Sequence, residues 1–128
     1  MNRRALPPDT RPDDTPSWEA LDLLATMVAV VNRAGECLFV NAVLESVIGL
    51  SRRTLTQRHL HEWFREPAAL GDAIDAVARN EFSTRRFEGA LRRATVGHIE
   101  SLPVHIIVSQ TEHTGQRILV EMIEIEQQ

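Results

Sequence analysis

The spacing of hydrophobic positions changes from helical to strand-like near Thr84. Between Pro67 and Asn80, apolar residues fall at i, i+3, i+4, i+7 and i+8, which predicts an amphipathic helix with Pro67 in its first turn. From Thr84 onward apolar and polar residues alternate, which predicts strands. Turns at Gly97 and at residues 112–115 divide this region into three strands.

The last two of these strands carry irregular positions. Pro103 has no amide donor, so its end of the strand should lie at a sheet edge or a bulge. In the final strand, Arg117 to Glu126, the apolar phase shifts after Met122 to Ile123 and Ile125. A bulge or a departure from the sheet near Met122 would explain the shift.

The segment from Val28 to Ser51 predicts a strand, a turn, a second strand, a short helix and a glycine stop. The turn at residues 32–35 is short enough for the two strands to pair as a hairpin. Asn41 follows the second strand, where a helix N-cap is needed, and Gly49 ends the helix. Short helical turns are expected between Ser51 and Phe64.

The N-terminal region divides into a tail and a helix. Residues 1–17 contain four prolines among polar residues, which predicts a disordered tail. Ser17 can cap a helix from Trp18 to Thr26. After this helix, the predicted order is two strands, three helices and three strands. This order gives five antiparallel strands with helices on one face, which is an α+β fold in a single domain over residues 18–128.

Composition narrows the function classes. The net charge is −4 and all 14 basic residues are arginine, so there is no basic field for nucleic acid and no polybasic membrane patch. No apolar run is long enough to span a membrane. Cys37 is the only cysteine, which excludes an internal disulfide and agrees with a reducing compartment. We therefore expect a cytoplasmic protein with Cys37 as a small buried hydrophobe.

Phe39-x-Asn41, Glu45 and Gly49-Leu50-Ser51 resemble the recurrent motif of PAS domains, whose element order the chain also follows. Within that family the chain is most similar, from Leu21 to Gln128, to the N-terminal sensory domain of nitrogen-regulation histidine kinases of the NtrB type. The more particular matches are Leu23-Leu24, Leu119-Val120-Glu121-Met122 and Glu126-Gln127-Gln128.

This resemblance implies a regulatory and dimerisation module of a two-component system. Its implied partners are a second copy in a homodimer, the kinase core, a transcriptional response regulator and a PII-type regulatory protein. The chain has neither a complete His-Glu-x-x-Asn-Pro phosphoacceptor motif nor a glycine-rich nucleotide box. We therefore expect no catalytic residues in this chain and no enzyme activity of its own.

No cofactor or metal is expected either. Light-sensing relatives carry a reactive cysteine in an Asn-Cys-Arg-Phe segment, whereas Cys37 precedes Leu38. Haem-binding relatives use a histidine on the long helix, and the helix predicted from Pro67 has none. His59-x-His61 has no third ligand at regular spacing.

Three groups of apolar residues are candidate functional sites. Each also has a structural interpretation: filling the core, folding the helix back over its own sheet, or forming a plain strand. The groups are a small-ligand pocket (Phe39, Ile74, Val77, Val104 and Ile106), a dimerisation face (Trp18, Leu21, Leu24 and Ala25) and a signal-output strand end (Met122, Ile123 and Ile125).

Three functions follow from these candidates. The first is the sensory and dimerisation module of a nitrogen-responsive kinase. The others are a PAS domain that binds a small ligand in another signalling protein, and a stand-alone adaptor.

Overall fold

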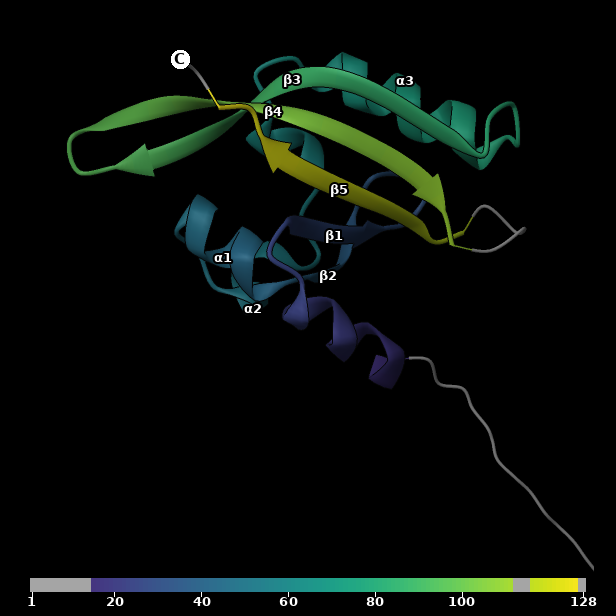
Figure 1. Cartoon of the computed structure of the whole chain (residues 1–128), viewed down its shortest axis with the longest axis horizontal. Helices are drawn as coiled ribbons and strands as arrows, with labels where there is room; N and C mark the ends of the chain where they lie inside the picture. The colour runs from purple at the N-terminus through teal and green to yellow at the C-terminus, as the bar shows by residue number, and fades with distance from the viewer. Residues whose placement is uncertain (1–14, 112–115, 127–128) are drawn as a thin grey trace, which may run out of the picture.

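The computed structural model describes residues 15–111 and 116–126. Five strands form one antiparallel sheet in the order β2-β1-β5-β4-β3, which confirms the predicted α+β class (Figure 1). The predictions for residues 1–14, 112–115 and 127–128 lie outside the described residues. The elements are η3 (Thr15–Leu23), β1 (Met27–Val31), β2 (Cys37–Val40), α1 (Ala42–Ile48), α2 (Arg52–Leu55), η4 (Leu60–Trp63), α3 (Pro67–Ala78), β3 (Thr84–Thr95), β4 (His98–Gln110) and β5 (Ile118–Glu124).

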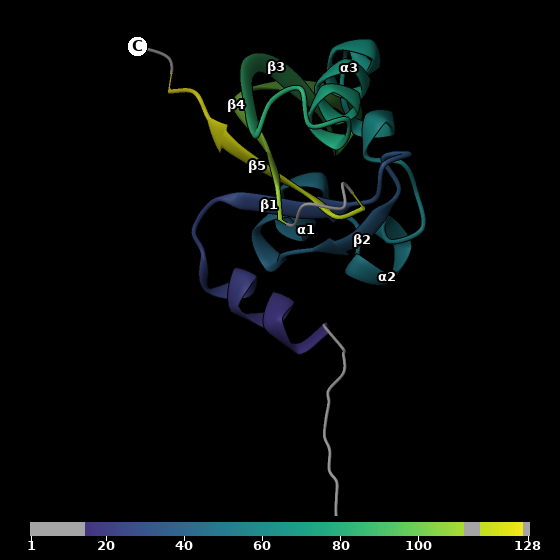
Figure 2. The same cartoon turned by 90° about the vertical axis from the view of Figure 1, so that its right-hand side faces the viewer.

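The core lies between the sheet and the helices α1 to α3. Helix α3 packs against β3 and β4, while α1 and α2 pack at the β1–β2 end (Figure 2). The predicted alternation in β4 and β5 is confirmed, since Val104, Ile106 and Val108 face the core together with Val120 and Met122.

The first hairpin and the helix after it form as predicted. β1 and β2 pair antiparallel around the turn at residues 32–35. The Asn41 side chain accepts a hydrogen bond from the Leu44 backbone N–H, which caps α1. Gly49 ends the helix with φ +87°, a left-handed conformation that favours glycine.

The N-terminal helix differs from the prediction. It is a 3₁₀ helix over Thr15–Leu23, so it begins three residues earlier than Trp18 and does not continue to Thr26. With three residues per turn, Trp18 and Leu21 lie one turn apart on the same edge. The carbonyls of Leu21 and Thr26 both accept hydrogen bonds from the Asn41 side chain, and this draws the chain after Leu23 towards β1.

The end of β5 excludes one of the two predicted alternatives, the bulge, and agrees with the other, a departure from the sheet. Its register with β4 is regular from Gln110–Ile118 to Val104–Glu124, so the predicted bulge near Met122 is wrong. Met122 pairs with Met27 of β1 and with Ile106 of β4. Beyond Met122, β5 keeps only β4 as its neighbour, and it leaves the sheet after Glu124.

Strands β3 and β4 extend past the end of β5 as a two-stranded ribbon, defined here as residues 91–102 (Figure 1, left). Pairing between β4 and β5 begins only at Val104, and the Pro103 carbonyl accepts a hydrogen bond from Ile125 N–H. Pro103 therefore lies at the point where the interior strand β4 becomes an edge, as its missing donor predicts.

Candidate functional site

Three residues of the PAS-like motif, together with Arg52, which follows its last residue, converge on the N-terminal helix. Phe39 lies on β2, Asn41 at the start of α1, Glu45 within α1, and Arg52 at the start of α2. We call these four residues the η3 seat, because each contacts η3 or a residue that does. η3 lies below β1 and β2, on the far side of these strands from α3 (Figures 1 and 2).

Asn41 uses both ends of its amide and is fully buried. Its Oδ1 accepts from the backbone N–H of Val28 at 3.0 Å and of Leu44 at 3.1 Å. Its Nδ2 donates to the carbonyl oxygens of Leu21 at 3.0 Å and Thr26 at 2.9 Å. Because all these partners bind one buried amide, the position of η3 is fixed relative to β1 and α1.

An ion pair and two rings complete the η3 seat. The Arg52 guanidinium donates to both oxygens of Asp22 on η3, at 2.8 and 3.0 Å. Glu45 holds Arg52 by accepting a hydrogen bond from its backbone N–H. The Phe39 ring lies between the Arg52 guanidinium, 4.6 Å from its centroid, and the Trp18 ring, at 5.9 Å between centroids.

The predicted dimerisation face is divided by this arrangement. Trp18 and Leu21 are half-buried against their own chain, as the fold-back interpretation expects. Leu24 is 44% exposed and Ala25 is exposed. Leu23, the last residue of η3, is 87% exposed but was not among the predicted residues. With three residues per turn it lies off the edge that Trp18 and Leu21 share, so neither helical period groups it with them.

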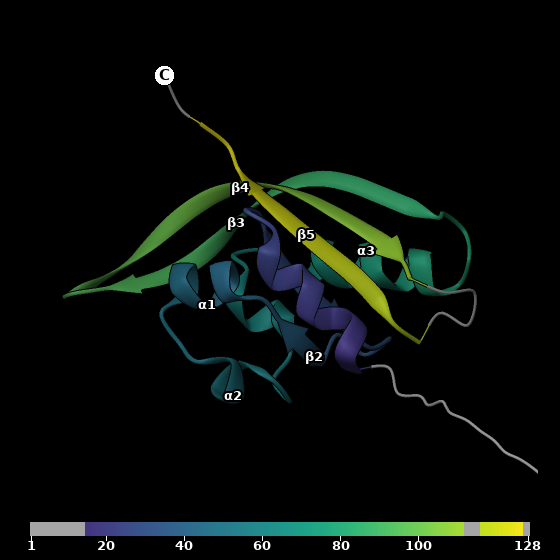
Figure 3. The ribbon, with the colours of Figure 1, turned by 60° about the horizontal axis from the view of Figure 1, so that its bottom comes forward.

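The predicted output residues lie beside the same segment. Thr26 Oγ1 donates to Glu121 on β5 at 2.8 Å, and Met27 pairs with Met122. Met122 is buried, Ile123 is 39% exposed on the opposite face, and Ile125 is half-buried. The chain therefore enters β1 next to the place where β5 ends (Figure 3). We call the apolar residues of this region the exit patch: Leu23, Leu24, Ala25, Ile123 and Ile125.

The predicted pocket residues do not share one space. Ile74, Val77, Val104 and Ile106 belong to the core cluster and are at most 1% exposed. Phe39 pairs with Val30 outside that cluster and contacts Trp18 instead, so its assignment to the inner face is wrong. The register shift in β2 explains the error, because one extra residue reverses the faces after Cys37.

Two side chains with reactive groups are shielded from solvent, because Cys37 is buried and His61 is half-buried. Cys37 is buried, as expected, and burial, with a smaller contribution from Glu62, raises its thiol pKa to about 12. The His61 ring packs against Gly35 and Gly71, and burial and the neighbouring His59 lower its pKa. Within residues 15–111 and 116–126, no cluster of three or more candidate ligands could hold a metal ion.

No helix in the described part of the chain is both long and apolar enough to cross a membrane.

Comparisons with known proteins identify the fold. The family model described as "PAS fold" matches residues 21–119. No curated protein matches the chain.

Three solved structures resemble the chain at low sequence identity. The PAS domain of nitrogen regulation protein NR(II) from Vibrio parahaemolyticus is 16% identical, with a TM-score of 0.63 over 88% of this chain and 100% of that one. A PAS domain from a two-component sensor histidine kinase is 18% identical, with a TM-score of 0.66 over 85% and 93%.

The third is the PAS domain of the RpfR quorum-sensing receptor from Cronobacter turicensis, solved in complex with BDSF. It is 14% identical, with a TM-score of 0.68 over 80% of this chain and 96% of that one. At these identities the structures show the shared fold alone. Because the family model covers most of the sheet and helices described above, the chain belongs to the PAS family.

Proposed function

We propose that this PAS domain is the regulatory and dimerisation module of a cytoplasmic nitrogen-regulation sensor histidine kinase of the NtrB type. In this role it controls phosphorylation of a transcriptional response regulator and is itself regulated by a PII-type protein. The observation that carries the proposal is the exit patch. Exposed leucines at the end of η3 lie beside the strand end that leads out of the domain.

The arrangement supports a route for the signal. Met122 contacts the core from β5, whereas Ile123, the next residue, faces the opposite side. A change in core packing that moves Met122 would therefore move the outward residues at the end of β5. With a second copy packed on the exit patch, that shift would change the relative position of the two chains where they leave their domains.

The test uses the full-length protein encoded by the gene. Ile123→Asp and Ile125→Asp should each alter autophosphorylation or its response to PII protein. Val96→Asp, a fully exposed position at the ribbon tip, serves as the control. Circular dichroism of the isolated domain verifies that each variant is folded. Unchanged kinase activity and unchanged regulation in both isoleucine variants would refute the proposed output route.

A second candidate is a small-ligand receptor, supported by the likeness to the RpfR domain solved with BDSF. Ile74, Val77, Val104 and Ile106 would contact such a ligand only if the packed core opened. Native mass spectrometry of the purified protein separates the candidates. A retained small molecule favours the receptor, and a mass equal to that of the polypeptide alone favours the regulatory module.

A further inference from the structure

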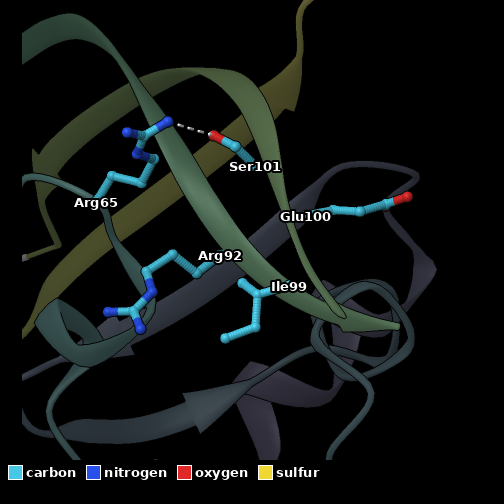
Figure 4. A pocket seen from close by; sticks show the side chains of 5 residues that line it. All are labelled: Arg65, Arg92, Ile99, Glu100 and Ser101. Carbon is cyan, nitrogen blue, oxygen red and sulfur yellow. Dashed lines mark hydrogen bonds between the residues drawn. The ribbon is translucent and has the colours of Figure 1, made fainter. Parts of the chain in front are cut away.

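A surface pocket of about 280 Å³ lies where the end of η4 meets the ribbon (Figure 4). Arg65 reaches it because its backbone N–H bonds to the carbonyl of Ala90, which holds the segment after η4 alongside β3. Arg92 and Ser101 are cross-strand neighbours, so their side chains share one face. The pocket is lined by Arg65, Arg92, Ile99, Glu100 and Ser101.

Two of the five side chains that line this pocket are arginines. Within the described residues, neither Arg65 nor Arg92 forms an ion pair with a carboxylate. Glu100 is held by Arg93 at 2.7 Å. Arg65 Nη1 instead points towards the Ser101 hydroxyl, 3.4 Å away (Figure 4). Guanidinium groups and a hydroxyl are the donors that bind phosphate and carboxylate groups.

An apolar hollow of about 90 Å³ adjoins the charged pocket and shares Arg92 and Ile99 with it. Trp63 is half-buried in its wall, and Ile99 is 62% exposed. Glu62, which also lines the hollow, is paired with Arg58. A ligand here would therefore place an apolar group next to its anionic one.

We propose that Arg65, Arg92 and Ser101 bind the phosphate or carboxylate group of a small organic anion whose apolar part rests on Trp63 and Ile99. This site lies on the face of the ribbon opposite Leu91 and Leu102, which point into the core. It is therefore separate from the core ligand space and does not depend on the kinase proposal.

Phenyl phosphate, titrated by calorimetry at constant ionic strength, is the probe. Arg65→Gln and Arg92→Gln should each weaken its binding about tenfold, because each removes charge-assisted hydrogen bonds. Arg86→Gln is the matched control, since Arg86 lies on the same strand but does not line the pocket. Glu66→Gln should strengthen binding, because Glu66 lines the next hollow beside Arg65.

Two further probes separate the charged and apolar halves of the site. Inorganic phosphate should bind more weakly than phenyl phosphate, and neutral benzyl alcohol more weakly still. The proposal is overturned if phenyl phosphate binds no better than benzyl alcohol, or if Arg86→Gln weakens it as much as Arg92→Gln does. Amide NMR spectra of the variants establish that each one is folded.

Discussion

The N-terminal helix η3 and the ribbon are both attached to the main part of the sheet, but by different kinds of interaction. At the seat, a buried amide, an ion pair and a tilted contact between two rings tie η3 to two strands and two further helices. In the ribbon, backbone pairing is supplemented by the half-exposed Arg93–Glu100 pair, and Val96 at the tip is fully exposed. Side-chain specificity is thus concentrated where the chain enters and leaves the domain.

The largest expected effect is at the centre of the seat. Asn41→Ala leaves two buried N–H groups and two part-buried carbonyls without their partner, so we expect a loss of about 3 kcal/mol in the free energy of unfolding, measured by urea denaturation. Asn32→Ala is the control. Asn32 also accepts two backbone hydrogen bonds, but at the exposed hairpin turn, and should cost about 1 kcal/mol or less. Equal losses would remove the distinction between seat and surface.

Weakening the ion pair should have a smaller effect, which is confined to the helix. Arg52→Gln removes a partly exposed pair with Asp22, at a cost of about 1 kcal/mol or less. Because Trp18 and Arg52 both contact the Phe39 ring, we expect the Trp18 fluorescence, recorded in a Trp63→Phe background, to shift to longer wavelength. Arg79→Gln, which breaks comparable pairs on α3, should leave the Trp18 emission unchanged. A Trp18 spectrum that is unaltered by Arg52→Gln would mean that the ion pair does not position η3.

A pH effect is expected at His61, which links the first hairpin to α3. Its pKa in the folded protein lies below the ordinary value of 6.5, so the unfolded chain takes up a proton more readily as the pH falls. Stability should therefore decrease as the pH drops below about 6.5. His61→Gln should reduce the difference in unfolding free energy between pH 7 and pH 5, whereas Val96→Ser, which changes no titratable group, should not. A difference unchanged by His61→Gln would assign the pH effect to other groups.

The smallest effect is expected at the tip of the ribbon. Val96→Ser should change the free energy of unfolding by no more than about 0.5 kcal/mol, because the side chain is fully exposed. A larger loss in thermal denaturation would show that the ribbon tip contributes to folding in a way that its exposure does not suggest.

Most features that depend on neighbouring residues could be predicted from the sequence, whereas contacts between distant segments could be predicted only in part. The Asn41 cap, the Gly49 stop and the helix after Pro67 depend on neighbouring residues, and all three are present. The face of Phe39 depends on an extra residue in β2, which no periodicity in so short a strand reveals. The wider role of Asn41 depends on carbonyls 15 and 20 residues away.

The charged pocket could not be predicted for the same reason. Arg65 and Arg92 meet only because Phe64 pairs with Leu91, a contact between segments far apart in the sequence. No local pattern in the sequence indicates that these two arginines lie together.

We propose that the η3 seat holds Leu24 beside the end of β5 and that two copies associate through the exit patch. Sedimentation velocity over a concentration series tests this association. We expect a concentration-dependent dimer that Leu24→Asp abolishes while circular dichroism stays unchanged. A wild-type chain that remains monomeric throughout the series, or a folded Leu24→Asp variant that dimerises as strongly as the wild type, would contradict it.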